Sequence, residues 1–322
     1  MPLHLRWTHD LTAPLFGVPM AGPAVIVPGS FALLGLDPAT GDTRWRLDAG
    51  AAPQSFAWAV MSLRGPVACA GRDRAWRITG LDPAGAVRFT ARFEGWSSEA
   101  VPLGDHTYVL FTHEGPRGAL WALDGAGVCT RRWEVPAGGF SLGASGDHLV
   151  FAVRAGADAG LYRVDLPDGG VRRLIAGAVE RVEGLGDRVV VQRPGGAAAV
   201  HDGEGRVVWE VAQGGLTPHL AADGFYGAEP GDDGWAAVCR DGDTGALRWR
   251  RVVPDAGRYL EVFPWQTSVV LWDAGPLTLV DRGTGEARET LAGDFTAVGP
   301  GGCGSGVLVV GAGERVLAFE AS

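Results

Sequence analysis

The residue types that most often perform catalysis or bind metals are scattered along this chain without a spacing typical of an active site. The seven histidines, at positions 4, 9, 106, 113, 148, 201 and 219, form neither an i, i+4 pair nor an H-E-x-x-H pattern. His106 and His113 flank a short apolar run, and their odd spacing predicts opposite faces of a regular strand. We therefore interpret the histidines as turn or surface residues and predict no metal site.

Two other segments have residue types that could bind an ion or a phosphate. Asp232 and Asp233 offer adjacent carboxylates for calcium, and a solvated loop is the alternative interpretation. The glycine-rich segment 299–306 lacks the Lys-Ser/Thr pair of a phosphate-binding loop and precedes no expected helix. We expect it to be a loop between strands.

The four cysteines, at positions 69, 129, 239 and 303, match no C-x-x-C or zinc-site spacing. We interpret them as small apolar core residues of a protein in a reducing compartment, rather than as disulfide partners.

Composition predicts a glycine-rich globular protein and excludes several other classes. The chain has 322 residues, of which 46% are hydrophobic and 20% are charged, with 51 glycines and a net charge of −9. This is too apolar for a disordered chain. All 28 basic residues are arginine, and neither Lys nor Asn occurs, a bias expected of a GC-rich genome. The chain therefore has no lysine for a Schiff base and no Asn to bind calcium.

The charge and apolar patterns also limit the partners and the location that we expect. Nucleic acid binding needs a clustered basic surface, whereas the short arginine clusters here fit solvated strand faces. No apolar run reaches the roughly 18–20 residues of a membrane-spanning helix. The first residues lack the pattern of a secretory signal. We expect a cytoplasmic protein, or a periplasmic one if a signal peptide has been removed.

An internal repeat organises the whole sequence. An apolar run, an acidic residue, a few turn residues and a glycine recur, with the acidic anchors at Asp37, Asp82, Asp124, Asp165, Asp202, Asp241, Asp281 and Glu320. Neighbouring anchors are 37 to 45 residues apart. A period near 40 with short strands and glycine turns is typical of a β-propeller, in which each blade is a four-stranded antiparallel sheet.

The spacing that recurs within each repeat has a local physical reason. The Asp side chain can accept hydrogen bonds from the amides of the turn, and the Gly can adopt the left-handed conformation of a turn with a bulge. An aromatic residue follows four positions after the Gly at Phe89, Trp45, Trp209 and Trp249. We expect its ring to pack on the hairpin of the neighbouring blade.

Counting strands predicts how the first and last repeats meet. Eight strands end at the anchors, but only seven are followed by a turn and an outer strand. The segment 3–7 has the pattern of the missing outer strand, including its aromatic residue Trp7. We therefore predict one domain, residues 1–322, with eight four-stranded blades, in which the N-terminal strand completes the C-terminal blade.

The D-x-x-T-G-x-x-x-W pattern, seen at 37–45 and at 241–249, resembles the repeat of the PQQ-like (quinoprotein alcohol-dehydrogenase-like) propeller family. The enzymes of that family hold calcium through Glu, Asn and Asp beside the quinone, and many carry a vicinal Cys pair next to it. This chain has no Asn, no adjacent cysteines and no C-x-x-C-H haem motif. We therefore expect neither a cofactor nor an enzymatic activity.

In such a propeller, the segments that lead into the innermost strands gather around the axis. In this chain they carry residues that the repeat does not explain, namely Trp96, Glu99, Phe140, Arg181, His219, Arg258 and Tyr259. Aromatic residues with Arg and Glu have the composition of a protein-binding hot spot. The alternative is that each aromatic ring only closes the mouth of the channel. Trp235 and Trp265, which we place in irregular segments, are weaker candidates.

The sequence thus favours a non-catalytic scaffold that binds a protein or peptide partner on its axial face, as a monomer or within a hetero-complex. It resembles in this respect the propellers of bacterial outer-membrane assembly lipoproteins. Two alternatives remain open. The first is an enzyme that binds a quinone or another small molecule in the channel, and the second is a sensor module for a separate kinase or ATPase subunit.

Overall fold

A computed structural model of the chain describes residues 3–12, 15, 17–49, 55–72, 75–114, 117–167, 169–212, 218–257, 259–299, 303–304 and 306–321. Within these ranges, the side chains of residues 55–57, 72, 75, 96–98, 113–114, 303–304 and 321 are outside the description. The described residues form strands and no helix, as predicted for an all-β protein. This part of the chain accordingly has no helix with the length and apolar character needed to cross a bilayer.

The chain divides into two compact units, residues 1–137 with 294–322 and residues 138–293, which we call the first and second unit. The strands of the first unit are β1 (Leu3–Asp10), β2 (Val25–Pro28), β3 (Ala32–Leu36), β4 (Thr43–Asp48), β5 (Ser55–Ser62), β6 (Gly65–Arg72), β7 (Ala75–Leu81), β8 (Val87–Glu94), β9 (Trp96–Leu103), β10 (His106–Glu114), β11 (Arg117–Leu123), β12 (Cys129–Val135), β29 (Cys303–Gly304), β30 (Val307–Ala312) and β31 (Arg315–Ala321).

The strands of the second unit are β13 (Gly139–Ser145), β14 (His148–Val153), β15 (Gly160–Asp165), β16 (Val171–Ala176), β17 (Arg181–Leu185), β18 (Arg188–Gln192), β19 (Ala198–Asp202), β20 (Val207–Val211), β21 (His219–Ala221), β22 (Gly224–Gly231), β23 (Gly234–Arg240), β24 (Leu247–Val252), β25 (Glu261–Trp265), β26 (Ser268–Trp272), β27 (Leu277–Asp281) and β28 (Ala287–Leu291).

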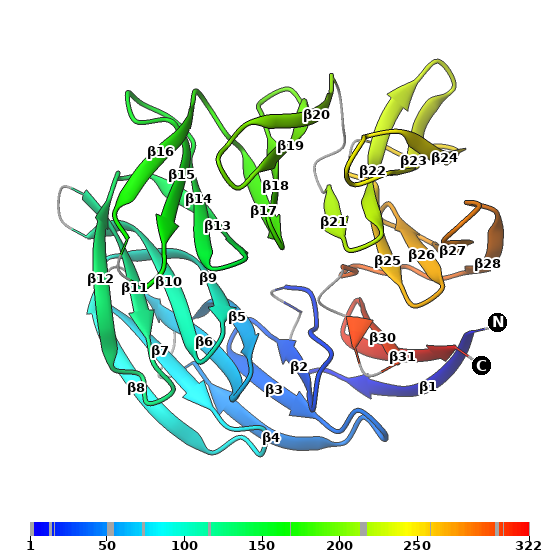
Figure 1. The fold of residues 1–322 in the computed structure, drawn as a ribbon. Helices are drawn as coiled ribbons and strands as arrows, with labels where there is room; N and C mark the ends of the chain where they lie inside the picture. The colour runs from blue at the N-terminus through cyan, green and yellow to red at the C-terminus, as the bar shows by residue number, and fades with distance from the viewer. Residues whose placement is uncertain are drawn as a thin grey trace. The chain divides into compact units, whose positions relative to one another are not determined.

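The described strands form eight antiparallel sheets, the fold of an eight-bladed β-propeller (Figure 1). Seven sheets have four strands, and the sheet β2–β3–β4 has three among the described residues. In that sheet an isolated bridge between Met20 and Ile26 lies where an innermost strand would pair with β2. The predicted fold class and number of blades are confirmed.

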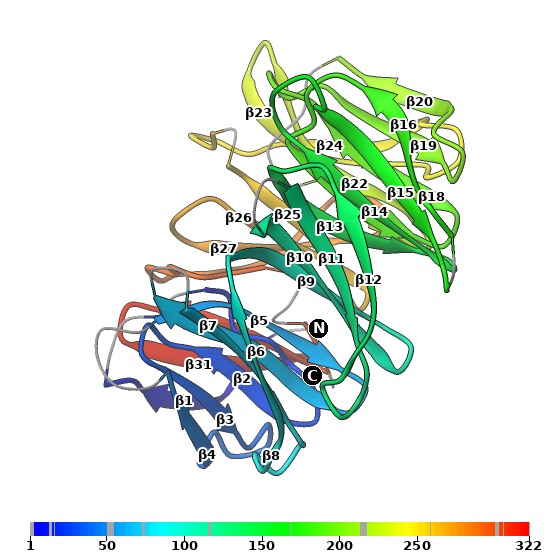
Figure 2. The same ribbon diagram turned by 90° about the vertical axis from the view of Figure 1, so that its left-hand side faces the viewer.

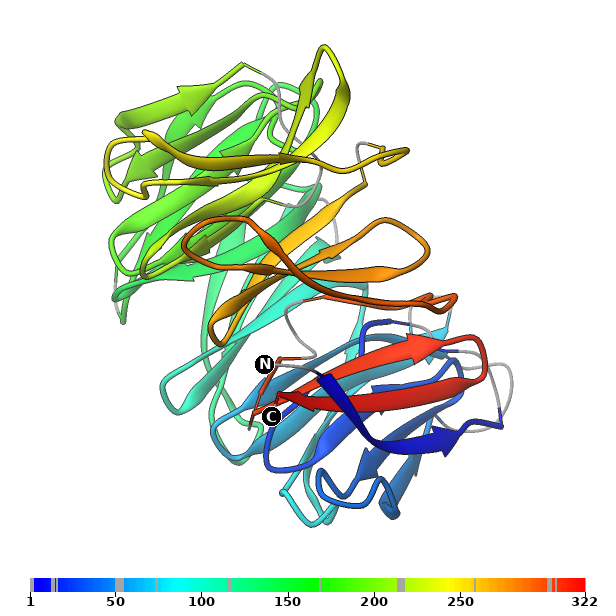
Figure 3. The same ribbon diagram turned by 90° about the vertical axis from the view of Figure 1, so that its right-hand side faces the viewer.

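The predicted closure of the last blade is also confirmed. Strand β1 pairs with β31 in antiparallel register, from Leu3 opposite Ala321 to Asp10 opposite Arg315, in a sheet of order β1-β31-β30-β29. Figure 3 shows the blue N-terminal strand alongside the red C-terminal strands. The outer edge that β31 would otherwise expose is therefore paired, which protects it from pairing with another chain.

The repeated turns have the predicted geometry. In the turn that begins at Asp241, the amides of Asp243 and Thr244 donate to Asp241 Oδ1 over 3.1 and 3.0 Å, and the register of β23 and β24 shifts by a bulge. The turn glycines are left-handed, with φ of 77° at Gly41, 87° at Gly85, 77° at Gly127, 82° at Gly205, 70° at Gly245 and 73° at Gly285.

An arginine seven residues after the Asp adds a contact that the sequence analysis did not anticipate. Arg44 and Arg248 each place Nη2 2.6 Å from the second carboxylate oxygen of Asp37 and Asp241, and Arg288 pairs with Asp281 in the same way. In Asp241 the arginine is the largest influence, followed by the turn amides, and together they hold its pKa well below the usual range. These carboxylates stay ionised and accept several hydrogen bonds at once.

The outer-strand aromatic residues pack on the next blade within each unit, as predicted. A Cβ added to Gly245 would lie 2.7 Å from the Trp209 ring, and one added to Gly285 would lie 2.8 Å from the Trp249 ring. Both indoles also donate to a turn carbonyl, Trp209 to Gly242 and Trp249 to Arg282, over 2.9 Å. The same ring-on-glycine contact occurs for Trp7 on Gly41, Trp45 on Gly85 and Phe89 on Gly127.

The core lies between neighbouring sheets rather than inside any single sheet. One buried cluster in the first unit joins residues of β6–β8 to residues of β9–β11, and includes Ile78, Val109 and Phe111, which are fully buried. Figure 2 shows these successive strands of the first unit. A blade therefore buries both of its faces only when its neighbours are present, because a single sheet of four strands has no core of its own.

The contact between the Trp209 ring and Gly245 predicts that an alanine at this position lowers stability by more than its backbone conformation alone would. Gly245→Ala places a Cβ at positive φ and against the Trp209 ring, so we expect a loss of about 2–4 kcal/mol in unfolding free energy, measured with urea. The matched control is Gly186→Ala in the same unit, where φ is +60° and no atom lies within 4 Å of the added Cβ. Its cost should be only about 1 kcal/mol, and equal costs in the two variants would contradict the ring contact.

Candidate functional site

The innermost strands of the second unit begin at residues that the sequence analysis singled out. Phe140 is the second residue of β13, Arg181 begins β17 and His219 begins β21, whereas Tyr259 lies two residues before β25. We call this end of the second unit the inner-strand face. The prediction that these residues lie in connecting segments is wrong for Phe140, Arg181 and His219, because Phe140 lies within β13 and pairing extends to Arg181 opposite Gln192 and His219 opposite Tyr226.

The other candidates do not join this face as described. Trp96 and Glu99 lie in β9 of the first unit, where the half-buried Glu99 pairs through its backbone with Leu110. They too are strand residues and not part of a connecting segment. The side chain of Trp96 and the whole of Arg258 lie outside the described residues.

The centre of the inner-strand face is a histidine between two carboxylates. His219 is buried, with 6% of its side chain exposed, and its Nδ1 lies 3.2 Å from Glu183 Oε2 on β17. Its Nε2 lies 3.3 Å from Glu261 Oε2 on β25. Glu183 also accepts a hydrogen bond of 3.0 Å from the Leu220 amide, and its Oε2 is 3.9 Å from Arg181 Nη2. Four charged side chains thus connect three neighbouring blades.

The pairing outweighs the effect of burial on the ionisation of this cluster. Burial by itself would lower the pKa of His219, but the hydrogen bonds and negative charges of Glu183 and Glu261 raise it above its ordinary value. Burial would raise the pKa of Glu183, but His219, Arg181 and the Leu220 amide together lower it. The positive charge of His219 and the negative charges of the two glutamates therefore keep these buried groups ionised.

Around this cluster the face presents aromatic rings to solvent. Tyr259 is 58% exposed, and Phe31 in the first unit is the other aromatic side chain more than half exposed among the described residues. Phe140 is half-buried, and the guanidinium of Arg154 lies over its ring, 4.4 Å from the centroid. A cation above an aromatic face and an exposed tyrosine are both suited to contact a partner.

Sequence reasoning missed three residues of this face, namely Arg154, Glu183 and Glu261. The alternation Arg181-x-Glu183 is the one local signal, because residues two apart in a strand lie on the same face of the sheet. Nothing in the sequence pairs Glu183 with His219, which is 36 residues away, since that contact arises from the stacking of neighbouring blades.

The interpretation of the histidines as turn or surface residues is wrong for three of them. His148, His201 and His219 are buried in strands, at 5%, 1% and 5% exposure, because an imidazole can bury its apolar ring while one nitrogen keeps a polar partner. His201 Nδ1, for example, lies 3.0 Å from the carbonyl oxygen of Gly205. Bulges between Leu110 and His113 interrupt β10. The strand is therefore not regular, which was the condition for the expectation that His106 and His113 lie on opposite faces.

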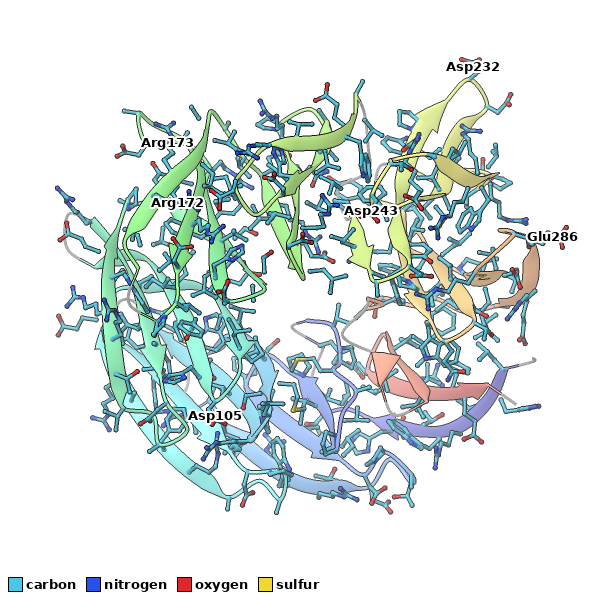
Figure 4. All side chains as sticks on the ribbon, viewed as in Figure 1. Asp105, Arg172, Arg173, Asp232, Asp243 and Glu286 are labelled. Carbon is cyan, nitrogen blue, oxygen red and sulfur yellow. The ribbon has the colours of Figure 1, made fainter. Side chains whose placement is uncertain are left out.

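The acidic and arginine clusters have the surface positions expected of them. Asp232 and Asp233 are exposed in the hairpin between β22 and β23, and Asp232 stands at its tip (Figure 4). The described residues contain no group of three or more His, Cys, Asp or Glu side chains that could hold a metal ion. Arg172 and Arg173 are exposed on β16 (Figure 4), and Arg172 Nη1 lies 3.0 Å from Glu204 Oε2.

Two tryptophans and one cysteine differ from their predicted settings. Trp235 lies in β23 and Trp265 in β25, so neither is in an irregular segment, and Trp265 is buried at 4% exposure. Cys69 and Cys239 are buried free thiols, as expected of core residues, whereas Cys129 is exposed at the start of an outer edge strand. The side chain of Cys303 lies outside the described residues.

The strand arrangement is similar to that of several solved structures. BamB from Moraxella catarrhalis is 18% identical, with a TM-score of 0.67, over 100% of this chain and 98% of that one. The computationally designed Ika8 protein is 13% identical, with a TM-score of 0.77 and coverage of 98% and 99%. The C-terminal WD40 domain of Sif2 is 10% identical, with a TM-score of 0.66 and coverage of 99% of each chain.

At these identities the likeness shows the fold alone, because one propeller fold supports many functions. The sequence matches no family model and no curated protein.

The ionisation of Glu183 predicts an acid-dependent contribution to stability. Its folded-state pKa lies below the ordinary 4.5, so the folded state binds fewer protons than the unfolded state in acid, and stability falls as the pH drops below about 4.5. Glu183→Gln should lower the unfolding free energy at pH 6 by about 1–3 kcal/mol and make the acid decline shallower. Urea unfolding between pH 3 and 6 measures both effects.

The matched control for this variant is Glu180→Gln, a half-buried carboxylate one residue before β17. Its stability should stay within about 0.5 kcal/mol of the wild type, with an unchanged acid slope. Equal acid slopes for Glu183→Gln and the wild type would show that the His219 contact does not bias the ionisation of Glu183.

Proposed function

We propose that this protein is a non-catalytic propeller scaffold of the PQQ-like repeat type, and that it binds a protein or peptide partner through the inner-strand face of the second unit. The observation that carries the proposal is the combination of exposed Tyr259 and partly exposed Arg181 with a charged cluster that holds the surrounding strands in place. Tyrosine and arginine, together with tryptophan, are the residue types enriched at binding hot spots.

The repeat itself does not require these side chains. The turn carboxylates, the left-handed glycines and the outer aromatic rings account for the packing of successive blades. Tyr259 and Arg181 lie at the other end of the strands, where no repeated position calls for a tyrosine or an arginine. A large aromatic side chain that is mostly exposed, at a position the repeat does not specify, indicates a surface used for contact.

The exposed side chains of the inner-strand face are attached to a backbone held by buried contacts, which favours a role in binding. Arg181 begins a paired strand and lies beside Glu183, whose carboxylate is held by His219 and the Leu220 amide. Leu260, next to Tyr259, is buried at 1% exposure, and its amide donates to the carbonyl oxygen of Gly257 over 3.1 Å. Side chains positioned before binding lose less conformational entropy when a partner arrives.

The test is capture of a partner from the native lysate by the wild-type protein and by the double variant Tyr259→Ala/Arg181→Ala, with quantitative mass spectrometry. If both side chains are hot spots, the double variant should bind the captured protein at least about thirtyfold more weakly in a titration with that purified protein.

The matched control is Leu63→Ala, which truncates a side chain that is 80% exposed in the first unit. It should bind like the wild type. A partner retained equally by a folded Tyr259→Ala/Arg181→Ala variant would exclude this face, and retention lost in Leu63→Ala instead would place the binding surface elsewhere.

A further inference from the structure

The two ring nitrogens of His219 both face carboxylate oxygens, and this geometry depends on a proton. Nδ1 lies 3.2 Å from Glu183 Oε2, and Nε2 lies 3.3 Å from Glu261 Oε2. A neutral imidazole has one N–H and one lone pair, so it can donate to only one of these oxygens and opposes the other with a lone pair. Only the imidazolium donates to both carboxylates at once.

The charge count of the cluster leads to the same state. Among the described residues, the charged groups that face His219 are Arg181 and Glu183 on β17 and Glu261 on β25. Two positive and two negative charges balance when His219 is protonated, whereas the neutral imidazole leaves one uncompensated negative charge in a buried site. Two uncharged neighbours are Phe263 on β25, whose ring stands edge-on with its centroid 6.0 Å from that of His219, and Tyr226 on β22, which pairs with His219 through the backbone.

We propose that Glu183, His219 and Glu261 form a proton-dependent clasp, in which protonated His219 ties β25 to β21 and β17, and loss of the proton releases Glu261. The clasp is a property of the second unit and is independent of whether the inner-strand face binds a partner. No chemical step is involved other than the binding and loss of one proton.

Glu261 is the carboxylate that is released, because Glu183 has other partners. Glu183 keeps the Leu220 amide at 3.0 Å and Arg181 at 3.9 Å when the proton leaves. The Glu261 side chain contacts only His219 in the hydrogen bonds and ion pairs of the described residues, and it can turn to solvent. The backbone of Glu261 stays paired with Trp272 in the sheet, so the release loosens only the turn before β25, where the Leu260 amide donates to Gly257.

The clasp makes the stability of the folded state depend on pH, and the raised pKa of His219 gives the direction of that dependence. The folded-state pKa of His219 lies above its ordinary value of 6.5, so the folded state holds the proton more tightly than the unfolded state does. The stabilisation is therefore complete below about pH 6.5 and is lost as the pH rises through the folded-state pKa. This pH range is separate from the acid range in which Glu183 is protonated.

The experiment follows the Cε1–H resonance of His219 by NMR between pH 5 and 9 in the wild-type protein, after triple-resonance assignment. We expect a titration midpoint above 6.5. Glu261→Gln should lower the proton affinity of His219 about tenfold or more, because it removes one of the two carboxylate charges. Two references are measured in the same way. The first is Glu180→Gln, which should not move the His219 midpoint. The second is His201, whose ring nitrogen contacts a carbonyl oxygen and not a carboxylate, and which should titrate below 6.5.

A second measurement reports the release itself. Hydrogen exchange at the Leu260 amide, corrected for the intrinsic pH dependence, should lose protection as the pH passes the His219 midpoint. In Glu261→Gln the protection should already be low and independent of pH.

Two results would overturn the proposal. One is a His219 midpoint at or below 6.5 in the wild type, or one that Glu261→Gln does not lower. The other is protection of Leu260 that does not change across the His219 titration. Because Glu261 is partly exposed, Glu261→Gln is expected to fold even if His219→Gln does not. Loss of partner binding by Tyr259→Ala/Arg181→Ala bears on the proposed function alone, because the clasp is tested in the wild-type protein and in Glu261→Gln, which both keep Tyr259 and Arg181.

Discussion

The contact between an outer-strand aromatic ring and the turn glycine of the next blade is the interaction on which each unit depends. A four-stranded blade is too thin to bury its own residues, so its stability comes from the sheets on either side. Trp209 on Gly245 and Trp249 on Gly285 close that interface at its outer end, and each indole adds a hydrogen bond to a turn carbonyl. Only glycine leaves room for the ring, which explains why the residue recurs.

Two arrangements of charged side chains among the described residues stabilise different parts of the blades. At three of the repeated turns, one carboxylate oxygen of the Asp accepts hydrogen bonds from backbone amides and the other pairs with an arginine, as seen at Asp37, Asp241 and Asp281. These ionised carboxylates stabilise the hairpins. At the inner-strand face, His219 and two glutamates link three different blades instead. The turn contacts are local and repeated, whereas the His219 cluster joins three blades of the second unit through one buried histidine.

Much of the architecture could be predicted because its signals are local. The turn that begins at Asp241 is closed by hydrogen bonds from the amides of residues two and three positions later. The pattern that encodes the turn is therefore short and can be recognised in the sequence. The pairing of β1 with β31 was predictable by counting, since the last repeat lacked an outer strand. Trp265 and His201 were misplaced because a single residue type does not reveal whether it faces a neighbouring sheet or solvent. Of the candidate site, the sequence indicated Arg181, His219 and Tyr259 as residues outside the repeat.

By itself, the sequence determined the all-β class, the eight repeats near 40 residues, the turn geometry and the closing strand, because each follows from hydrogen bonds and packing between residues close in the chain or from the count of repeats. Only the tertiary structure decided that Glu183, His219 and Glu261 meet, because the members of this cluster are 36 and 42 residues apart and their approach depends on how one blade stacks on the next. It also decided which aromatic rings are buried and which, like Tyr259, remain exposed.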